Sequence, residues 1–264
     1  MEKEQLDFYK KWFKDYVAGF YADDEYVNAN LKLKENHTYA VCSQMAYLTD
    51  KLNIGDKDLL IAQTIALFHD VGRFEQFAKY GTYNDLKSVN HCQLALDVLR
   101  RHGVLNELQE GQSRVIKTAI RLHGQKSLPV DLDRDAEIFA KLIRDADKID
   151  IYRVVIEAYK QSLVEPDRLK LEIEFPDEPN YSWHVVEAVL RQQSLDYSQL
   201  RTLNDMKLMQ LAWVFDVNFD ETLLKIRQNQ FLEQIIALLP QTDDITRVAK
   251  CVFDYVAARL EKVG

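Results

Sequence analysis

Apolar side chains recur every three or four residues along most of the chain, which is the spacing of one face of an α-helix. The first segment shows this spacing at Leu6, Tyr9, Phe13, Tyr16, Val17 and Phe20. Residues 59–68 are apolar on most sides, which predicts a central, buried helix. This helix is expected to end at His69-Asp70, with Gly72 just beyond it as the C-terminal glycine. The pattern predicts an all-α fold.

The same spacing predicts further helices, with Asp56 and Ser88 as N-terminal caps for two of them. They are expected to include residues 37–48, 88–102, 105–123, a stretch from 133 or 135 past 159, and then about 184–194, 198–215, 219–239 and 243–262. Residues 74–87 are predicted to be irregular, and residues 125–133 a loop. Residues 165–181 contain three prolines and many charges, which indicates a boundary or a surface excursion, with a short strand at 169–175.

Composition narrows the class of protein. Hydrophobic residues make up 47% and charged residues 29% of the 264 residues, the balance of a soluble globular protein. The net charge of −8 argues against a duplex nucleic-acid footprint. We find no run of about 18 apolar residues, so no membrane partner is expected. The charged N-terminal residues and the 3 cysteines without short spacing suggest a cytoplasmic protein with reduced thiols.

The candidate chemistry lies in the histidines. His37, His69, His91 and His123 are predicted near the ends of helices, beside small or acidic residues. Asp70 follows His69 at the foot of the most buried helix, where a carboxylate is costly unless it is paired or bound to a cation. Asp147 is a second buried acid, because Ala146 and Ile149 beside it are apolar. A structural His-Asp pair without metal is the alternative.

Several motifs together resemble the HD superfamily of metal-dependent phosphohydrolases. The order is His37, then Leu67-Phe68-His69-Asp70-Val71-Gly72-Arg73, then Asp145-Ala146-Asp147-Lys148-Ile149-Asp150. Ser88-Val89-Asn90-His91 and Ile120-Arg121-Leu122-His123-Gly124 match the subset of the family with two extra histidines. The resemblance covers about residues 31–160. It implies an HD-like helical bundle for that part of the chain. With the helical pattern of the remaining residues, we expect a single all-α domain over 1–264, with additional C-terminal helices at about 182–264.

The resemblance also implies a ligand set and a reaction. His37, His69, Asp70 and Asp147 correspond to the ligands of a first metal ion. His91 and His123 correspond to those of a second ion, with Asp70 bridging the two. Iron, manganese, zinc, cobalt and nickel all suit nitrogen and oxygen ligands, and one or two ions are expected. A metal-activated water would attack the phosphorus of a small phosphomonoester or nucleotide. The glycine–tyrosine–proline signature of the cyclic-dinucleotide branch is absent, so that substrate is not assigned.

Alternatives remain open for individual residues and for the reaction. His91 and His123 could bind a substrate phosphate or form hydrogen bonds without a second metal. Arg73 is a candidate phosphate ligand or a helix C-terminal cap, and Lys148 a candidate phosphate ligand or a solvated charge. The ligand set also resembles the di-iron oxygenases of the same superfamily, and a non-catalytic nucleotide- or metabolite-binding module is a third hypothesis. The aromatic residues of the C-terminal half are compatible with a core, a lid over the cleft or a homo-oligomer face.

Overall fold

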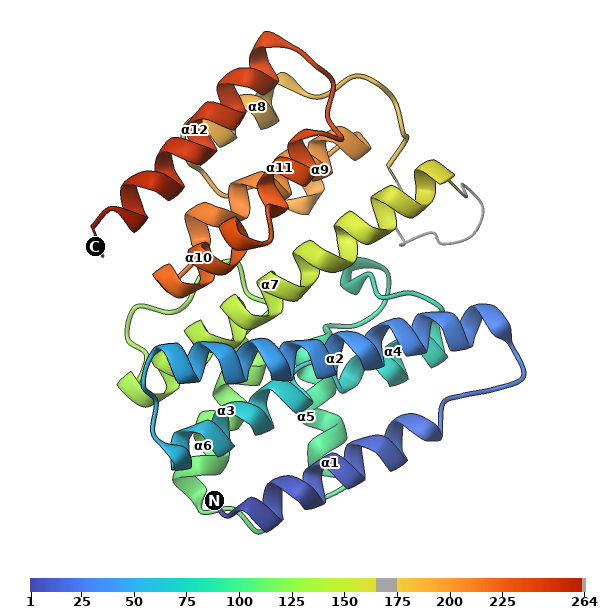
Figure 1. Ribbon diagram of the computed structural model, residues 1–264. Coiled ribbons are helices and arrows are strands. Elements are labelled where there is room, and N and C mark those ends of the chain that lie inside the picture. The colour runs from blue at the N-terminus through green and yellow to red at the C-terminus, as the bar shows by residue number, and fades with distance from the viewer. Residues whose placement is uncertain (165–174, 263–264) are drawn as a thin grey trace. The chain divides into compact units, whose positions relative to one another are not determined.

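The computed structural model describes residues 1–164 and 175–262, and every regular element within these ranges is a helix (Figure 1). The predicted all-α class, an HD-like bundle followed by C-terminal helices, is therefore confirmed. The strand expected at 169–175 lies outside the described residues except for Phe175, which is in a bend. None of the described helices is both long and apolar enough to cross a membrane.

The chain divides into two compact units, Met1–Asp150 and Ile151–Gly264, and the boundary falls within the long helix α7. The first unit contains α1 (Lys3–Ala18), α2 (Glu25–Lys51), α3 (Asp56–Phe68), α4 (Gly72–Tyr80), η1 (Asp85–Lys87), α5 (His91–Arg101), α6 (Glu110–Leu122) and the first half of α7 (Arg134–Val164). The single-domain organisation expected for residues 1–264 stays a prediction.

Helix α3 is the centre of the first unit, as its apolar composition predicts. Its last four residues, Ile65 to Phe68, are at most 1% exposed. Helices α1, α2 and α6 all pack against it. The Phe68 ring meets the edges of Tyr9 and Trp12 from α1, at centroid distances of 5.4 and 5.7 Å. The functional end of α3 therefore rests on a rigid apolar base.

Helix α4 is a correction to the sequence analysis, because it occupies part of a segment predicted to be irregular. Phe74 and Phe77 lie three residues apart and are almost fully buried, which gives this short helix an apolar face. Gly81 ends it with a left-handed φ of 66°. Gly72 is the first residue of α4 and does not terminate α3 in the left-handed conformation expected of a C-terminal glycine.

The starts of three other helices also differ from the expectation. The caps are Gly55 for α3 and Asn90 for α5, in place of Asp56 and Ser88. Asn90 accepts a hydrogen bond from the backbone N–H of Gln93, which satisfies one of the free donors at that helix start. Helix α6 begins at Glu110, five residues later than expected, because residues 102–107 form turns.

The second unit contains the rest of α7, then α8 (Trp183–Leu190), η2 (Tyr197–Gln199), α9 (Leu203–Ala212), η3 (Trp213–Asp216), α10 (Asp220–Gln228), α11 (Phe231–Ile236) and α12 (Asp243–Leu260). The continuous helix expected at 219–239 is split at Gln230, whose φ of 54° is left-handed. Helix α8 packs on α9 and α12. Tyr152 is fully buried and stacks on Phe231.

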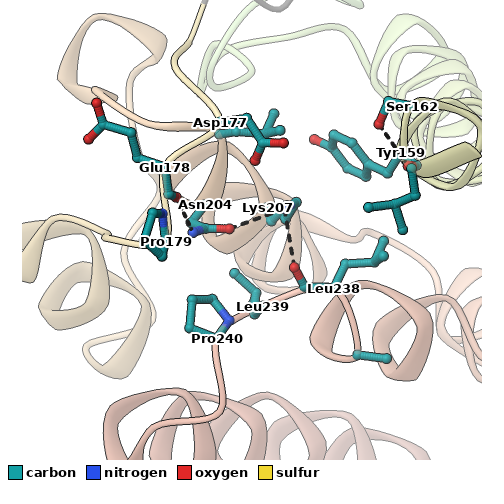
Figure 2. A pocket seen from close by; sticks show the side chains of 13 residues that line it. Tyr159, Ser162, Asp177, Glu178, Pro179, Asn204, Lys207, Leu238, Leu239 and Pro240 are labelled. Carbon is teal, nitrogen blue, oxygen red and sulfur yellow. Dashed lines mark hydrogen bonds between the residues drawn. The ribbon is translucent and has the colours of Figure 1, made fainter. Parts of the chain in front are cut away.

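A cavity of about 450 Å³ lies within the second unit, lined by residues of α7, α9 and the segment after α11 (Figure 2). Lys207 is 6% exposed there and donates to Asn204 Oδ1 and the Leu238 carbonyl. In residues 1–164 and 175–262, no carboxylate lies within ion-pair distance of its ammonium group. Burial lowers the pKa of Lys207, because it disfavours the ammonium form.

Candidate metal centre

The ends of several helices bring the candidate ligands together in the first unit. His69 follows the last residue of α3, and Asp70 lies in the turn before α4. His91 is the first residue of α5, and His123 is the C-terminal cap of α6. His37 and Asp147 project from within α2 and α7. The imidazoles of all four histidines are buried. Residues more than a hundred positions apart thus meet at one point.

The first set of donors consists of His37, His69, Asp70 and Asp147. His37 Nε2 lies 3.0 Å from Asp147 Oδ1 and 3.8 Å from Asp70 Oδ2. His69 Nε2 lies 3.8 Å from each of the same two oxygens. When two ligand atoms each lie about 2.0–2.2 Å from the same transition-metal ion, the distance between the two atoms is similar to these separations. The structure therefore brings all four side chains within reach of a common ion.

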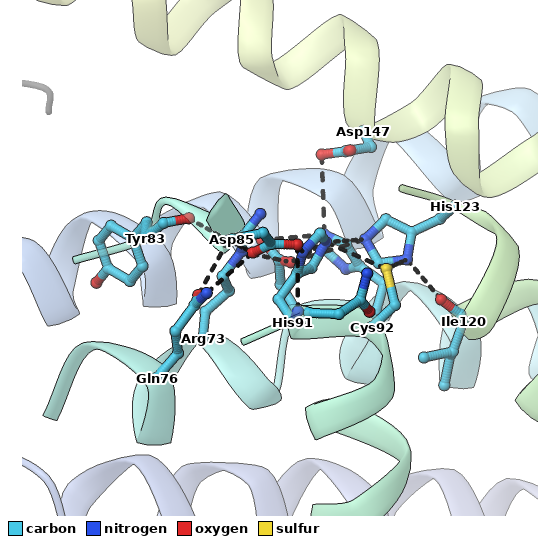
Figure 3. A network of polar contacts seen from close by, with 12 residues as sticks. Arg73, Gln76, Tyr83, Asp85, His91, Cys92, Ile120, His123 and Asp147 are labelled. Atoms are coloured by element: carbon cyan, nitrogen blue, oxygen red, sulfur yellow. Dashed lines mark hydrogen bonds and ion pairs between the residues drawn. The ribbon is translucent and has the colours of Figure 1, made fainter. Parts of the chain in front are cut away.

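The second set consists of His91, His123 and the other oxygen of Asp70 (Figure 3). His91 Nε2 and His123 Nε2 each lie 3.7 Å from Asp70 Oδ1 and 3.2 Å from one another. The two oxygens of Asp70 thus face different pairs of histidines. This arrangement suits a carboxylate that bridges two ions.

Hydrogen bonds fix the direction of every imidazole in the two sets. The Nδ1 atoms of His69 and His123 lie 2.8 and 2.7 Å from the carbonyls of Ala66 and Ile120, three residues earlier in their own helices. A carbonyl only accepts, so each Nδ1 carries the proton and each Nε2 presents a lone pair to the centre.

Carboxylates perform the same task for the other two histidines. His37 Nδ1 lies 2.8 Å from Asp150 Oδ2, and His91 Nδ1 lies 2.6 Å from Asp85 Oδ2. A carboxylate acceptor at Nδ1 orients the ring and makes Nε2 a stronger ligand. All four rings therefore have the tautomer that a metal ligand needs.

Unsatisfied buried atoms test whether an ion fits. His37 Nε2, His69 Nε2 and Asp147 Oδ1 are buried and have no hydrogen-bond partner in the described part of the chain. Buried polar atoms without a partner are uncommon and destabilising. These three atoms belong to one cluster, and a cation at its centre would satisfy all of them; the other two unpartnered atoms in the described residues, Tyr16 Oη and Gln210 Nε2, lie elsewhere. The donor set therefore fits a divalent metal ion.

Burial and charge favour the metal-binding protonation states of His69, Asp70 and Asp147. For His37, burial favours the neutral form, but hydrogen bonds to Asp147 and Asp150 outweigh it and raise the pKa. Burial lowers the pKa of His69 to about 4, so its imidazole is neutral. Burial raises the pKa of Asp70, but Lys34 and other cationic groups outweigh it and hold this pKa well below its usual range. For Asp147, the imidazole of His37 likewise overcomes burial and lowers the pKa. Neutral imidazoles and ionised carboxylates are the ligand forms.

Sequence reasoning missed three polar side chains of this site. Lys34 Nζ lies 2.9 Å from Asp70 Oδ2, and one turn of helix separates Lys34 from His37. Asp150 lies one turn after Asp147 on α7. Helical spacing could have indicated both. Asp85 comes from η1, where no local pattern points to the site.

Cys92, one of the three cysteines expected to be reduced thiols, touches the site. Its Sγ lies 3.3 Å from His91 Nε2 and 3.5 Å from His123 Nδ1. Burial favours the neutral thiol, but the neighbouring imidazoles of His123 and His91 outweigh it and lower the pKa of Cys92 to about 6. Its position directly after His91 was the only signal in the sequence.

The two candidate cations from the sequence motifs have different surroundings. Arg73 lies in the first turn of α4, where it does not cap α3. Its Nε donates to Asp70 Oδ1 at 3.3 Å, and its Nη1 donates to Asp85 Oδ1 at 2.9 Å and to the Tyr83 carbonyl. Lys148 is half-buried on α7, next to Asp147.

A comparison with protein-family models agrees with this geometry. Residues 35–152 match the model of the HD domain. This part of the chain is an HD domain. The resemblance stated from the sequence is therefore confirmed, and all six candidate ligands lie within the matched residues. No curated protein and no solved structure matches the chain.

The HD domain ends two residues into the second unit, so the candidate centre is complete within the first unit. Arg144 of the HD domain also secures the segment after His123, because its guanidinium donates to the carbonyls of Gln125 and Lys126. The C-terminal helices α8 to α12 lie outside the matched residues.

Proposed function

We propose that this HD domain is a metal-dependent phosphoric ester hydrolase that acts on a small phosphomonoester or nucleotide. The observation that carries the proposal is the placement of Asp70, whose two oxygens face two separate pairs of histidines. A shared carboxylate of this kind holds two ions about 3.5–4 Å apart in enzymes that clamp the attacking and leaving oxygens of a phosphoryl group.

The ligand assignment follows from the distances. His37, His69, Asp70 and Asp147 would hold a first ion, and His91, His123 and Asp70 a second. Iron, manganese, zinc, cobalt and nickel remain the candidate metals for these donors. Bound ions would supply a water of lowered pKa and would neutralise charge on phosphoryl oxygens. The chain's own contribution is to orient the lone pairs before any ion arrives.

Lys34 is our candidate for contact with the substrate. Its ammonium lies beside Asp70, its side chain is 19% exposed, and it sits 5.4 Å from the centre of the Tyr83 ring. A partly exposed cation at the edge of the metal centre is placed to bind a phosphoryl oxygen. Lys148 remains a second candidate for the same task.

Arg73 is better suited to positioning. Its donors already join Asp70, which is shared by the two sets, to Asp85, which orients His91. One guanidinium thus links both metal positions. The alternative role expected for Arg73, a bidentate grip on phosphate, stays a prediction.

The direct test is release of inorganic phosphate from a panel of nucleotides and phosphomonoesters. Each substrate is assayed with Mn²⁺, Fe²⁺, Co²⁺, Ni²⁺ or Zn²⁺ added to metal-free protein. We expect metal-dependent release from at least one substrate. If the protein binds metal but releases no phosphate from any of them, the hydrolase proposal fails and a binding module is favoured.

A substitution tests the role of Lys34 in the same assay. Measured at saturating metal, Lys34→Met should lower kcat/KM by roughly 10- to 100-fold, the loss expected for one charge-assisted contact. Lys32→Met is the matched control, because Lys32 is 57% exposed and pairs with Glu35. Equal activity of the two variants would argue against contact between Lys34 and substrate.

A di-iron oxygenase is the second candidate function, and the same observation favours it. Four imidazoles and two carboxylates, one of them shared, are also the ligand set of the oxygenases that the motifs resemble. Iron content of the untreated protein, oxygen-dependent turnover of a small polar substrate and a mixed-valence spectroscopic signal would favour this reading. Phosphate release without oxygen would exclude it as the main activity.

A further inference from the structure

The thiol of Cys92 lies against the second pair of histidines. The residue is 3% exposed, and its Sγ is 3.3 Å from His91 Nε2 (Figure 3). The other two cysteines differ: Cys42 is half-buried on α2, and Cys251 on α12 lies near backbone carbonyls of α8. Cys92 alone among the three cysteines is next to candidate ligands.

A second observation concerns the way in which the two histidines face each other. His91 Nε2 and His123 Nε2 face one another at 3.2 Å. The Nδ1 atoms of both rings already donate to oxygen acceptors, Asp85 and the Ile120 carbonyl. Two rings that both use Nδ1 as a donor turn their Nε2 atoms toward one another, and either a proton or a metal ion between them would satisfy both atoms.

The distances match those between ligands of one ion. With metal–nitrogen bonds of about 2.0–2.1 Å and a metal–sulfur bond of about 2.3 Å, neighbouring ligands of a tetrahedral ion lie about 3.3–3.6 Å apart. The His91–His123 and His91–Cys92 separations of 3.2 and 3.3 Å are close to this range. His91, Cys92 and His123 each offer a possible donor atom within 4.8 Å of the others. The nitrogen of His123 that contacts the sulfur, at 3.5 Å, is Nδ1.

Gly124 lies next to both the thiol and the imidazole. A Cβ at Gly124 would lie 2.9 Å from Cys92 Sγ and 3.0 Å from His91 Cε1. Any side chain at this position would therefore collide with both groups. The absence of a side chain at this position is what allows both groups to occupy the site.

We propose that Cys92 is a thiolate ligand of the second metal ion, together with His91, His123 and Asp70. The proposal rests on the two-ion arrangement of the proposed function. It adds a metal preference for the second site, because a soft sulfur donor favours Zn²⁺ over Mn²⁺. On binding, the S–H bond breaks, a sulfur–metal bond forms and the proton leaves to solvent. No oxidant or reductant takes part.

Cobalt is the probe that reports on sulfur ligation. Metal-free protein is titrated with Co²⁺ and its absorption spectrum recorded. We expect a thiolate-to-cobalt charge-transfer band in the near ultraviolet as the second equivalent binds. The band should disappear in Cys92→Ser and persist in the matched controls Cys42→Ser and Cys251→Ser.

A second measurement needs no variant, so it holds even if Cys92→Ser fails to fold. X-ray absorption of the zinc-loaded natural protein should show a sulfur neighbour at about 2.3 Å. In a folded Cys92→Ser variant, the preference for Zn²⁺ over Mn²⁺ at the weaker site should fall by at least about tenfold.

The outcomes separate this inference from the proposed function. Two bound ions and phosphate release, with neither the charge-transfer band nor a sulfur neighbour, would overturn the thiolate ligand and leave the hydrolase intact. A band that persists in Cys92→Ser would also overturn it. A sulfur signature without phosphate release would support the ligand and count against the hydrolase. A protein that binds neither cobalt nor zinc would overturn both.

Discussion

Individual side chains at the candidate centre are held in orientations that suit metal ligands. Each of the four histidines uses Nδ1 for a hydrogen bond and directs Nε2 inward. Asp70 contacts Lys34 through one oxygen and Arg73 through the other. Such partners fix orientation and lower the cost of assembling the site.

Asp70 is the residue whose loss should matter most. Asp70→Ala removes an oxygen from both sets of donors, so we expect bound metal and metal-dependent activity to fall by more than about 100-fold. The helical signal in circular dichroism should be largely kept, because the apolar core beneath α3 is unchanged. Elemental analysis of the purified variant measures the metal.

The control for Asp70→Ala is Asp97→Ala on α5. Asp97 is 37% exposed and pairs with Arg100 at the surface, so this substitution should leave the metal content unchanged. Full metal content in Asp70→Ala would refute the ligand assignment.

Lys207, in the second unit, predicts a dependence of stability on pH. Its pKa is lowered in the folded protein, while in the unfolded chain it is about 10.4. Between these values the unfolded state binds more protons, so the contribution of Lys207 to stability rises with pH and is lost as pH falls through the folded pKa. Relative to Lys207→Met, the natural protein should therefore gain stability from neutral pH toward pH ~10.

Urea unfolding of both proteins across this range measures the effect. Lys250→Met is the control, because the Lys250 side chain is 74% exposed. A difference between natural protein and Lys207→Met that does not change with pH would contradict the prediction.

At the level of secondary-structure elements, helix α4 packs very closely against α5. A Cβ at Gly72 would lie 2.5 Å from the Ala95 backbone nitrogen and 2.7 Å from the His91 carbonyl oxygen. Both are backbone atoms of α5, so neither can move aside without moving the helix. Since His91 begins α5, the spacing between these helices also sets the position of a candidate ligand.

Gly72→Ala should therefore destabilise the protein by about 1–3 kcal/mol or more. Gly111→Ala, in the first turn of α6, is a matched control, because no atom lies within 4 Å of its added Cβ. That control should be neutral or stabilising by about 0.4–1 kcal/mol. Thermal or urea unfolding compares them, and equal effects would show that the approach of α4 to α5 is not limiting.

Helical periodicity predicted most elements of the chain, and its failures have local causes. Long amphipathic segments such as α1 and α12 were evident, since each buries one regular face. Helix α4 was missed because its nine residues, the first of them a glycine, give a weak pattern, and its burial depends on helices distant in sequence. The break at Gln230 was missed because a non-glycine residue adopts positive φ there.

The whole molecule concentrates its candidate chemistry in one unit. All the proposed ligands lie in Met1–Asp150. An ion that bridges helices distant in sequence should stabilise that unit, because it binds only the folded arrangement.

Removal of metal should therefore act unevenly along the chain. After treatment with a chelator, we expect faster amide hydrogen exchange around His37, His69, His91 and His123, and little change in residues 183–260. Readdition of the metal should restore protection, whereas exposure of the untreated protein to Ca²⁺ is a control with little effect. Uniform loss of protection over the whole chain would contradict a stabilising role confined to the first unit.

The sequence by itself determined the helical class and the buried character of α3, because helical periodicity is a local property. It also identified the residues of the HD motifs, because a resemblance to a known family is read directly from short stretches of sequence. Only the tertiary structure decided that Asp70 faces two histidine pairs, that Asp85 and Asp150 hold His91 and His37, and that Cys92 touches the second pair. Those facts depend on distances between helices far apart in the chain, and packing of the whole first unit sets such distances.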